Sequence, residues 1–177
     1  MINRLKKYIR NKIKNEYTID DYRKLGVSIG ENCTIYSSNI DIGHAYLIEI
    51  GNNCTLTHCT ILAHDASTQK YFKKSKVGIV NIGDNTFVGW GSIILPNVTI
   101  GKNCIIGAGT VVSKNIPDNS VVAGNPGTVI STTTDFIQKN EAFLKTKPVF
   151  NKYWKYKTDE DKKKEKELLK DTFGFDE

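Results

Sequence analysis

A branched aliphatic residue recurs at every sixth position through the centre of the chain. The aliphatic positions of this run are Ile82, Val88, Ile94, Ile100, Ile106 and Val112. Glycine follows several of them, and the fourth residue after each is mostly small. A period of six fits neither an α-helix nor a simple alternating strand. It is typical of short strands joined by tight corners, so we expect three strands to close one triangular coil with each aliphatic pointing inward.

The same phase continues upstream of the central run. The further aliphatics in phase are Ile29, Ile50, Leu56 and Leu62. Three of the four cysteines, Cys33, Cys54 and Cys104, occupy the small position of their hexads, and no CxxC pair is present. We therefore interpret these cysteines as reduced, small core residues and not as metal ligands.

Two segments interrupt the six-residue rhythm. The phase shifts between Asp41 and Glu49, and again between Ala66 and Val80. The second segment is too polar and too cationic for an aliphatic column, so the sequence predicts a loop extruded from the coils over residues 66–80. Long loops in compact repeat proteins are uncommon and are often functional.

The ends of the chain differ from the repeat, which we place at residues 26–131. We expect residues 1–25 to form an N-terminal helical segment, because Ile2, Leu5, Ile9 and Ile13 recur at helical spacing. Residues 132–177 form a C-terminal helical extension, with helices expected over 135–147 and 157–171. Solenoids expose open strand edges at both ends, and we expect these two segments to cap them.

Composition narrows the class of protein. The chain has 177 residues and a formal net charge of +6. Its central block holds equal numbers of basic and acidic residues, so the excess charge lies in the terminal segments and does not indicate nucleic-acid binding. For the basic N-terminal helix, packing on the protein body is favoured over docking on a membrane. With no apolar run of about 20 residues and no signal-peptide pattern, we expect a cytoplasmic protein.

Two stretches carry a family resemblance. They are TILAHD, from Thr60 to Asp65, and IGDNTFVGWGSIILPNVTIGKNCIIGAGTVVSKNIPDNSVVAGNPGTVI, from Ile82 to Ile130. Together they resemble the hexapeptide-repeat acyltransferases, in particular the branch of galactoside, maltose, xenobiotic and capsular-polysaccharide O-acetyltransferases. The resemblance implies an all-β fold, a left-handed parallel β-helix. It also implies a homotrimer with active sites between subunits, acetyl-CoA as donor, a sugar-like hydroxyl as acceptor and no required metal.

The resemblance also implies which residues bind the donor. By position they are Gly89, Trp90, Gly107, Ala108, Gly109, Ser113 and Lys114. The small residues would let the backbone approach the pantetheine arm, and Lys114 would meet a CoA phosphate. The chain departs from the family in having Trp90 where a small residue is common, and Phe87 where tryptophan is frequent. Thr128 and Ser131 also replace basic residues that often meet the nucleotide of CoA.

His64 is the expected catalytic base among the three histidines. His58 and His64 share the third position of their hexads, so the phase cannot separate them. The family position and the adjacent loop favour His64, whose imidazole would take the acceptor proton, while His44 and His58 are expected to be structural. Three groups could orient His64: Asp65, a backbone carbonyl, or Glu49 one coil earlier. Asp65, Tyr71 and Phe72 are candidate substrate contacts, and the two aromatic residues could equally serve to pin the loop to the coils.

Other functions fit parts of the pattern. A γ-type carbonic anhydrase shares the expected fold and would hold zinc with three histidines, but the family's His-x4-His spacing is absent. A non-catalytic β-helix scaffold would give no reason for a histidine followed by a loop. Within the enzyme reading, the acceptor is expected to be a hydroxyl in a capsule or O-antigen sugar. A nucleotide-linked amino sugar, acetylated on nitrogen, an antibiotic hydroxyl and serine follow in that order.

Overall fold

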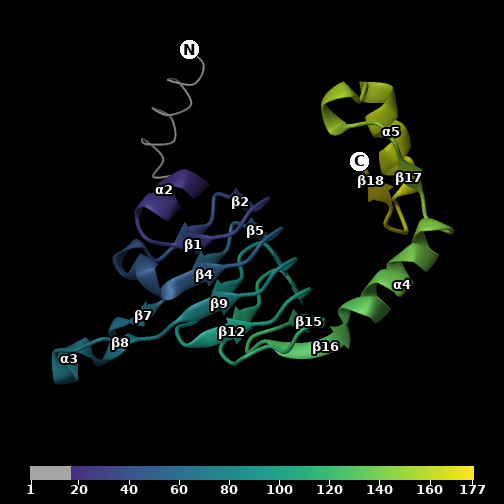
Figure 1. Cartoon of the computed structure of the whole chain (residues 1–177). Coiled ribbons are helices and arrows are strands. Elements are labelled where there is room, and N and C mark those ends of the chain that lie inside the picture. The colour runs from purple at the N-terminus through teal and green to yellow at the C-terminus, as the bar shows by residue number, and fades with distance from the viewer. Residues whose placement is uncertain (1–16) are drawn as a thin grey trace, which may run out of the picture. The chain divides into compact units, whose positions relative to one another are not determined.

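The computed structural model describes residues 17–177 (Figure 1). Contacts divide the chain into two compact units, one that ends at Thr133 and one that spans Thr134–Glu177. The amphipathic helix expected from Ile2 to Ile13 lies outside the described residues. No helix in residues 17–177 combines the length and the apolar character needed to cross a bilayer.

Three sheets form the three sides of the first unit. One side contains β1 (Ser28–Ile29), β4 (Ile48–Ile50), β9 (Val80–Ile82) and β12 (Val98–Ile100). The second contains β2 (Thr34–Tyr36), β5 (Thr55–Thr57), β10 (Phe87–Val88), β13 (Ile105–Ile106), β15 (Ser120–Ala123) and β16 (Thr128–Thr132). The third contains β3 (Asn39–Ile40), β6 (Thr60–Ile61), β11 (Ile93–Ile94) and β14 (Val111–Val112). All pairs in these sheets are parallel except β15 with β16, which confirms the predicted parallel β-helix.

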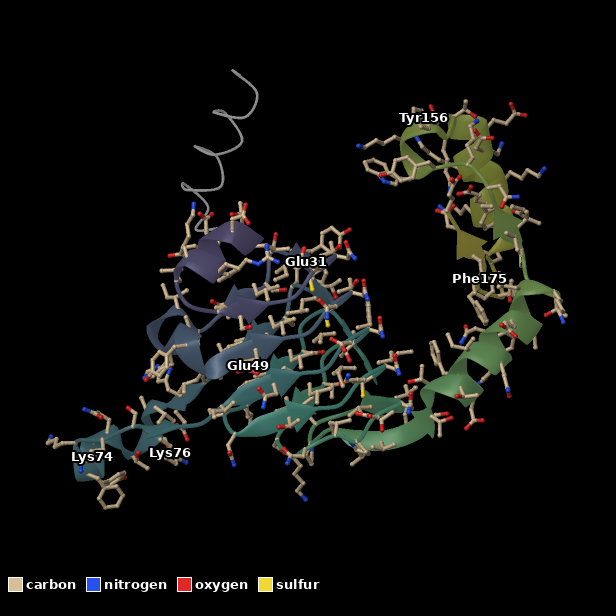
Figure 2. All side chains as sticks on the ribbon, in the orientation of Figure 1. Glu31, Glu49, Lys74, Lys76, Tyr156 and Phe175 are labelled. Carbon is tan, nitrogen blue, oxygen red and sulfur yellow. The ribbon has the colours of Figure 1, made fainter. Side chains whose placement is uncertain are left out.

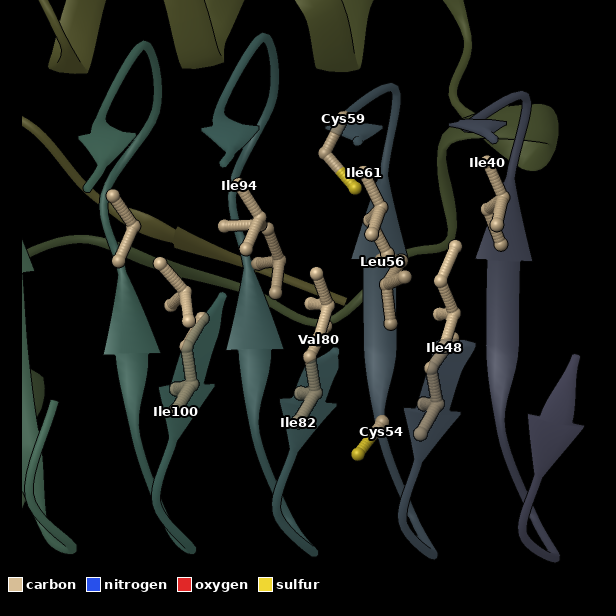
Figure 3. Packing of buried hydrophobic residues seen from close by; sticks show 14 of the residues in the cluster. Ile40, Ile48, Cys54, Leu56, Cys59, Ile61, Val80, Ile82, Ile94 and Ile100 are labelled. Atoms are coloured by element: carbon tan, nitrogen blue, oxygen red, sulfur yellow. The ribbon is translucent and has the colours of Figure 1, made fainter. Parts of the chain in front are cut away.

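A continuous column of aliphatic side chains fills the interior of the coils. Figure 3 shows Leu56, Ile82, Ile94 and Ile100 pointing between the strands. The buried residues that the hexad phase predicted are Ile29, Ile50, Leu56, Ile82, Val88, Ile94, Ile100, Ile106 and Val112. Cys54 and Cys104 are also buried, and burial raises the pKa of the Cys54 thiol to about 11. Each buried aliphatic contributes about 1.5–3 kcal/mol by leaving water, so the column is the main source of stability.

The hexad phase is wrong at one position, Leu62. Ile61 is fully buried and pairs with Ile94 of the next coil, whereas Leu62 is partly exposed. Leu56 pairs with Val88. The step between inward positions is therefore five residues from Leu56 to Ile61 but six residues from Val88 to Ile94 in the next coil.

The difference arises at the corner between these strands. His58 takes a left-handed backbone conformation with φ of 45°, as Gly91 does with φ of 71°, and the Gly91 amide donates to the His58 carbonyl. Trp90 is the additional residue of the longer corner. His58 therefore follows its inward aliphatic by two residues, while His64 follows Ile61 by three. The prediction that His58 and His64 share a hexad position is corrected by this shortened corner.

A second corner is held by a ladder of asparagine side chains. Each amide nitrogen donates to the amide oxygen of the next coil at 3.1 Å. The ladder consists of Asn53, Asn85, Asn103 and Asn119, all at positive φ. Asparagine tolerates this left-handed conformation better than most residues. Coils approach so closely here that a Cβ on Gly83 would lie 2.6 Å from the Gly101 carbonyl carbon.

The N-terminal end of the coil stack is covered by α2 (Ile19–Lys24). Tyr22 is buried on the first coil, and its hydroxyl donates to the Ser38 carbonyl at 2.7 Å. The Arg23 guanidinium donates to the carbonyls of Ile29 and Gly30. These bonds satisfy carbonyls at a strand edge that would otherwise be open. At the other end, β16 turns back antiparallel on β15.

The expected extruded loop is an ordered hairpin. It consists of β7 (His64–Asp65), η2 (Ala66–Thr68), α3 (Gln69–Phe72) and β8 (Lys76–Val77). β7 and β8 pair antiparallel, and the Gly78 amide donates to the Ala63 carbonyl at 2.9 Å where the hairpin leaves the coil. In Figure 1 the tip, α3, lies well away from the coils. The chain then re-enters the stack at β9.

The second unit contains the two helices expected near the C-terminus. Its elements are α4 (Thr133–Leu144), which begins at the last residue of the first unit, β17 (Val149–Phe150), η3 (Trp154–Tyr156), α5 (Asp159–Leu168) and β18 (Phe175–Asp176). The Lys157 side chain is 6% exposed, and its ammonium group lies 2.7 Å from the carboxylate of Asp176 and 2.9 Å from that of Glu165. Those hydrogen bonds raise the pKa of Lys157. The charged helix α5 is thus tied to the small sheet of its own unit.

Candidate active site

His64 lies where the hairpin leaves the coil. It is the first residue of β7, opposite Val77, and its side chain is 37% exposed. The preceding residue, Ala63, is fully buried, which fixes the backbone at this point. A reactive side chain is thus held on a rigid stack while one edge of its ring remains open to solvent.

Asp41 orients the His64 ring. It follows β3, which pairs with β6, and its amide donates to the Ile61 carbonyl at 3.0 Å. This pairing brings Asp41 beside the strand that leads to His64. One carboxylate oxygen of Asp41, Oδ2, accepts hydrogen bonds from His64 Nδ1 and from the Ala63 amide. The other oxygen accepts from the Gly43 amide at 3.2 Å, so the carboxylate is fixed on both sides.

The electrostatics of Asp41 favour its ionised form. Its side chain is 6% exposed, and this burial raises the pKa of the carboxyl. The hydrogen bonds from His64 and the Ala63 amide, with the nearby imidazoles, outweigh burial and place the pKa of Asp41 below its usual value. An ionised acceptor at Nδ1 keeps the proton on that nitrogen, so the lone pair of neutral His64 lies on Nε2. This is the arrangement of a general base.

His44 is the third member of the cluster. It lies in η1 (Ile42–Leu47), with its ring centroid 4.6 Å from that of His64. Its Nδ1 is 3.6 Å from the Asp41 carboxylate. The sequence predicts a structural role for His44 and gives no regular spacing that would pair Asp41 with His64. One feature of the sequence points to Asp41: the six-residue phase shifts there. Asp41 follows Ile40, and Ile40 pairs with Ile61, three residues before His64.

None of the three partners considered for His64 is its partner in the structure. Asp65 points to the other side of β7, where its carboxylate contacts Lys76 at 2.7 Å and accepts from the Ser67 amide. The Lys76 contact and then the Ser67 amide hold the pKa of Asp65 well below its ordinary range. Glu49 is exposed on β4 (Figure 2). Nδ1 meets a carboxylate, and not a backbone carbonyl, because Asp41 directly follows β3, which ends at Ile40 and pairs with β6.

Tyr71 and Phe72 lie on α3 at the tip of the hairpin. Both are about three-quarters exposed. Their rings contact each other, at 6.3 Å between centroids. They do not pin the hairpin to the coils of their own chain. Lys74 and Lys76 lie on the same projection (Figure 2), so the hairpin offers aromatic and cationic groups beyond the body of the β-helix.

Trp90 and His58 form a stacked pair at another corner. Their ring centroids are 3.6 Å apart and the planes meet at 26°. Trp90 is well exposed, so the pair presents an aromatic face to solvent. Because His58 is engaged here, the three histidines do not converge. Within residues 17–177 of one chain, His44 and His64 lie side by side while His58 stacks on Trp90, so the three imidazoles do not form one cluster.

Gly89, Gly107, Ala108 and Gly109 lie at the same corner as Trp90. The Gly89, Gly107 and Gly109 amides donate to the carbonyls of Ile106, Val122 and Trp90 in the coil ladder. The Gly89 amide is thus not free to donate to an oxyanion. The backbone hydrogen bonds of residues 17–177 leave the Ala108 amide without a carbonyl partner. A Cβ on Gly89 would lie 2.7 Å from the Ala108 nitrogen, so glycine at 89 keeps that amide open.

Ser113 and Lys114 follow the next strand, β14. Both are exposed and lie at the third corner of the coil. Ala108 precedes β14 and Lys114 follows it, so the two expected donor contacts flank one short strand. The structure therefore brings the donor residues to two neighbouring corners of the same coil.

The expected base and the Trp90–Ala108 corner are separate within one chain, whereas Ser113 and Lys114 follow β14 at the same end of the sheet as His64. β6 pairs with β11 in parallel, with Ile61 opposite Ile94. His64 lies beyond the C-terminal end of β6, whereas Trp90 lies before the N-terminal end of β11. The Asp41–His64 pair and the Trp90–Ala108 corner thus occupy opposite ends of one sheet. A single chain does not place the base beside that corner.

Comparisons with known proteins agree with this architecture. Residues 79–114 match the model of the bacterial transferase hexapeptide family, described as six repeats. The chain is 41% identical to Protein CapG of Staphylococcus aureus over 135 residues, which cover 72% of this chain and 78% of that protein.

Solved structures give the same result. A maltose O-acetyltransferase from Clostridium difficile 630 is 31% identical, with a TM-score of 0.53, and the match covers 64% of this chain and 73% of that one. A hexapeptide-repeat acetyltransferase from Vibrio cholerae shares the fold, at 16% identity and a TM-score of 0.54 over 70% of this chain and 86% of that one. The left-handed parallel β-helix is thereby confirmed, and the chain belongs to the bacterial hexapeptide-repeat transferase family.

Proposed function

We propose that the protein transfers an acetyl group from acetyl-CoA to a hydroxyl group of a sugar, in the biosynthesis of a cell-surface polysaccharide such as a capsule or O-antigen. The Asp41–His64 pair carries this proposal, because it presents an oriented, partly exposed base at the root of a projecting hairpin. The likeness to a maltose O-acetyltransferase supports a sugar hydroxyl as acceptor.

The reaction follows from the tautomer that Asp41 selects. His64 Nε2 takes the acceptor proton as the acceptor oxygen attacks the thioester carbonyl. The tetrahedral intermediate then expels the CoA thiolate, and His64 returns the proton to sulfur. Asp41 stabilises the transient imidazolium and keeps its own negative charge throughout. The Trp90 main-chain N–H is our choice of donor to the oxyanion, since the Gly89 amide is engaged.

The donor would bind along the corner of Trp90 and Ala108. The open Ala108 amide is suited to a carbonyl of the pantetheine arm, and the flanking glycines allow close approach. Lys114, beyond β14, offers a cation for a CoA phosphate. On the acceptor side, Tyr71, Phe72 and the lysines of the hairpin would cover the sugar and exclude water, which would otherwise hydrolyse acetyl-CoA. Asp65 would support this hairpin through Lys76.

A homotrimer would complete the site. Within one chain, His64 is separated from the corner that carries Trp90 and Ala108, here called the donor corner. In a closed threefold assembly, His64 of each subunit would lie against the donor corner of a neighbour. Co-expression of His64→Ala with Ala108→Glu tests this arrangement. Each variant alone should be inactive, whereas mixed trimers should recover activity by pairing an intact His64 with an intact Ala108. Loss of activity in the mixture, or a monomer in solution, would contradict the proposal.

The function itself is tested by release of CoA thiol from acetyl-CoA in the presence of a panel of sugars, amino sugars and serine. We expect turnover with a sugar hydroxyl, sequential kinetics and no acetyl-enzyme, since both substrates must be bound for direct transfer. Turnover confined to the amino group of an amino sugar would overturn O-acetylation. A protein whose melting temperature does not rise with CoA would contradict donor binding altogether.

A further inference from the structure

Three ligand-type side chains converge beside the base. Asp41, His44 and His64 each contribute one ligand atom, and these atoms all lie within 4.8 Å of one another. The residues come from two segments of the chain: Asp41 caps η1 and His44 lies within it, while His64 begins the hairpin. Such convergence from separate coils exceeds what the proposed proton transfer needs, since that step uses Asp41 and His64 alone.

His44 is the feature that the mechanism leaves unexplained. Its Nδ1 atom is buried, yet it has no hydrogen-bond partner in the structure. The nearest carboxylate oxygen, Asp41 Oδ2, lies at 3.6 Å, which is beyond hydrogen-bonding distance. A buried polar atom without a partner is costly. A ligand that accepts a lone pair from Nδ1 would remove this cost.

We propose that Asp41, His44 and His64 bind a zinc ion in competition with the catalytic role of His64. Two imidazoles and a carboxylate suit Zn²⁺, whereas Mg²⁺ and Ca²⁺ prefer oxygen ligands throughout. Zn–N distances of about 2.0–2.1 Å place tetrahedral ligand atoms roughly 3.3 Å apart. The 3.6 Å between His44 Nδ1 and Asp41 Oδ2 is close to that edge. Both histidine side chains are partly exposed, at 28% and 37%, which leaves an entry path and room for water as the fourth ligand.

Zinc binding would inhibit the enzyme through the tautomer of His64; this consequence rests on the proposed function. Coordination through His64 Nδ1, the nitrogen that faces Asp41, needs its lone pair, so the hydrogen bond to Asp41 must open and the proton on Nδ1 must move to Nε2. Nε2 then has no lone pair with which to take the acceptor proton. The same residue therefore cannot bind zinc and act as the base, and activity should fall as the site fills.

The test uses the full-length protein, ZnCl₂ as the probe and a buffer that does not chelate metals. Calorimetric titration should give one zinc per chain, and acetyl transfer should be inhibited over the same concentration range and restored by EDTA. His44→Ala should weaken binding by at least the roughly 10–100-fold that loss of an outer-shell partner costs. It should also shift the inhibition curve by the same factor, relative to its own zinc-free activity.

His58→Ala is the matched control, because it removes the remaining histidine of the chain without touching the cluster. It should bind zinc with wild-type affinity. A circular-dichroism melt should show that His44→Ala is folded. Equal zinc binding by wild type and folded His44→Ala, or no saturable binding by wild type, would overturn the site. One zinc per chain that depends on His44, in a protein without acetyl transfer, would keep the site and reject the proposed function.

Discussion

His64 Nδ1 and the carboxylate of Asp41 share a hydrogen bond although 23 residues separate them in the chain. The bond exists because β3 and β6 pair in register, so that Asp41 lies beside the segment that leads to the hairpin. It fixes both the orientation of the imidazole and the nitrogen that carries the proton.

Replacement of His64 by alanine should lower kcat by about 10²–10⁴, which is the usual contribution of a positioned general base. KM for acetyl-CoA should change little, because the proposed donor contacts are the Ala108 amide and Lys114, and not the imidazole. Steady-state assays of thiol release measure both constants. His58→Ala is the comparison: it removes the ring stacked on Trp90 and should act on KM for the donor. Equal losses of kcat in the two variants would remove His64 from the role of base.

Asp41→Asn preserves the size of the side chain and removes its charge. The amide cannot stabilise the imidazolium that forms during transfer, and its NH₂ group favours the wrong tautomer. We expect kcat to fall on the order of 10²-fold or more, toward the roughly 10⁴-fold cost of the same change in a Ser-His-Asp triad. Asp65→Asn is the matched control: it makes the same change at the residue after His64, and it should lower kcat far less. A larger effect at Asp65 would contradict the assigned pair.

The same carboxylate should give stability a specific dependence on pH. The pKa of folded Asp41 lies below its usual value, so folding favours the ionised form. Its contribution is fully present above the unfolded pKa of about 3.9 and is lost as pH falls through the lower, folded pKa. The melting temperature of Asp41→Asn should therefore lie below that of wild type near neutral pH, with the gap narrowing below about pH 4. Melts followed by circular dichroism check this, and a gap that is constant with pH would contradict it.

Lys114→Ala should raise KM for acetyl-CoA more than it lowers kcat. A phosphate contact is made equally in the ground state and the transition state, so its loss weakens binding without slowing the chemical step. The expected rise is on the order of tenfold. Lys102→Ala is the control, because that lysine lies at another corner and is paired with Asp84 at 3.1 Å. An identical, small effect in both variants would show that Lys114 is an ordinary surface lysine.

Ile100→Asp should prevent folding. Ile100 is 1% exposed in the aliphatic column, and an unpaired carboxylate at that position has no compensating partner. Thr99→Asp, one residue earlier on the same strand, points to the exposed face and should still give a cooperative melt. A soluble Ile100→Asp protein with a cooperative melt would refute the assignment of inward positions.

The sequence was sufficient to predict the fold because each side of the coil buries an aliphatic side chain at a regular interval of six residues. From Ile82 to Val112 each sixth residue must be inside, and every coil repeats the constraint. The prediction failed at Leu62, where the corner at His58 lacks one residue and shifts the inward position to Ile61. Aliphatic neighbours at 61 and 62 make the two phases equally apolar, so hydrophobicity alone cannot distinguish them.

The candidate site was predictable only in part, because only some of its residues follow the six-residue repeat or a family position. His64 was found through its family position beside an extruded loop. Asp41 was not, because its distance from His64 is set by the irregular turn at Ile42–Leu47, which follows no period. Side chains brought together by an interruption of the repeat leave no regular spacing in the sequence. The Asn ladder, by contrast, follows the repeat and recurs with it.

The hydrogen bond from the Gly78 amide to the Ala63 carbonyl closes the hairpin at its root. Because both residues also belong to the stacked coils, the aliphatic column continues across this point as though the intervening fourteen residues (64–77) were absent. The hairpin can consequently lengthen, shorten or change its composition during evolution without disturbing coil register. Under the proposed function, acceptor choice and donor binding would be inherited through separate parts of the chain, and new glycan specificities could arise on an unchanged scaffold.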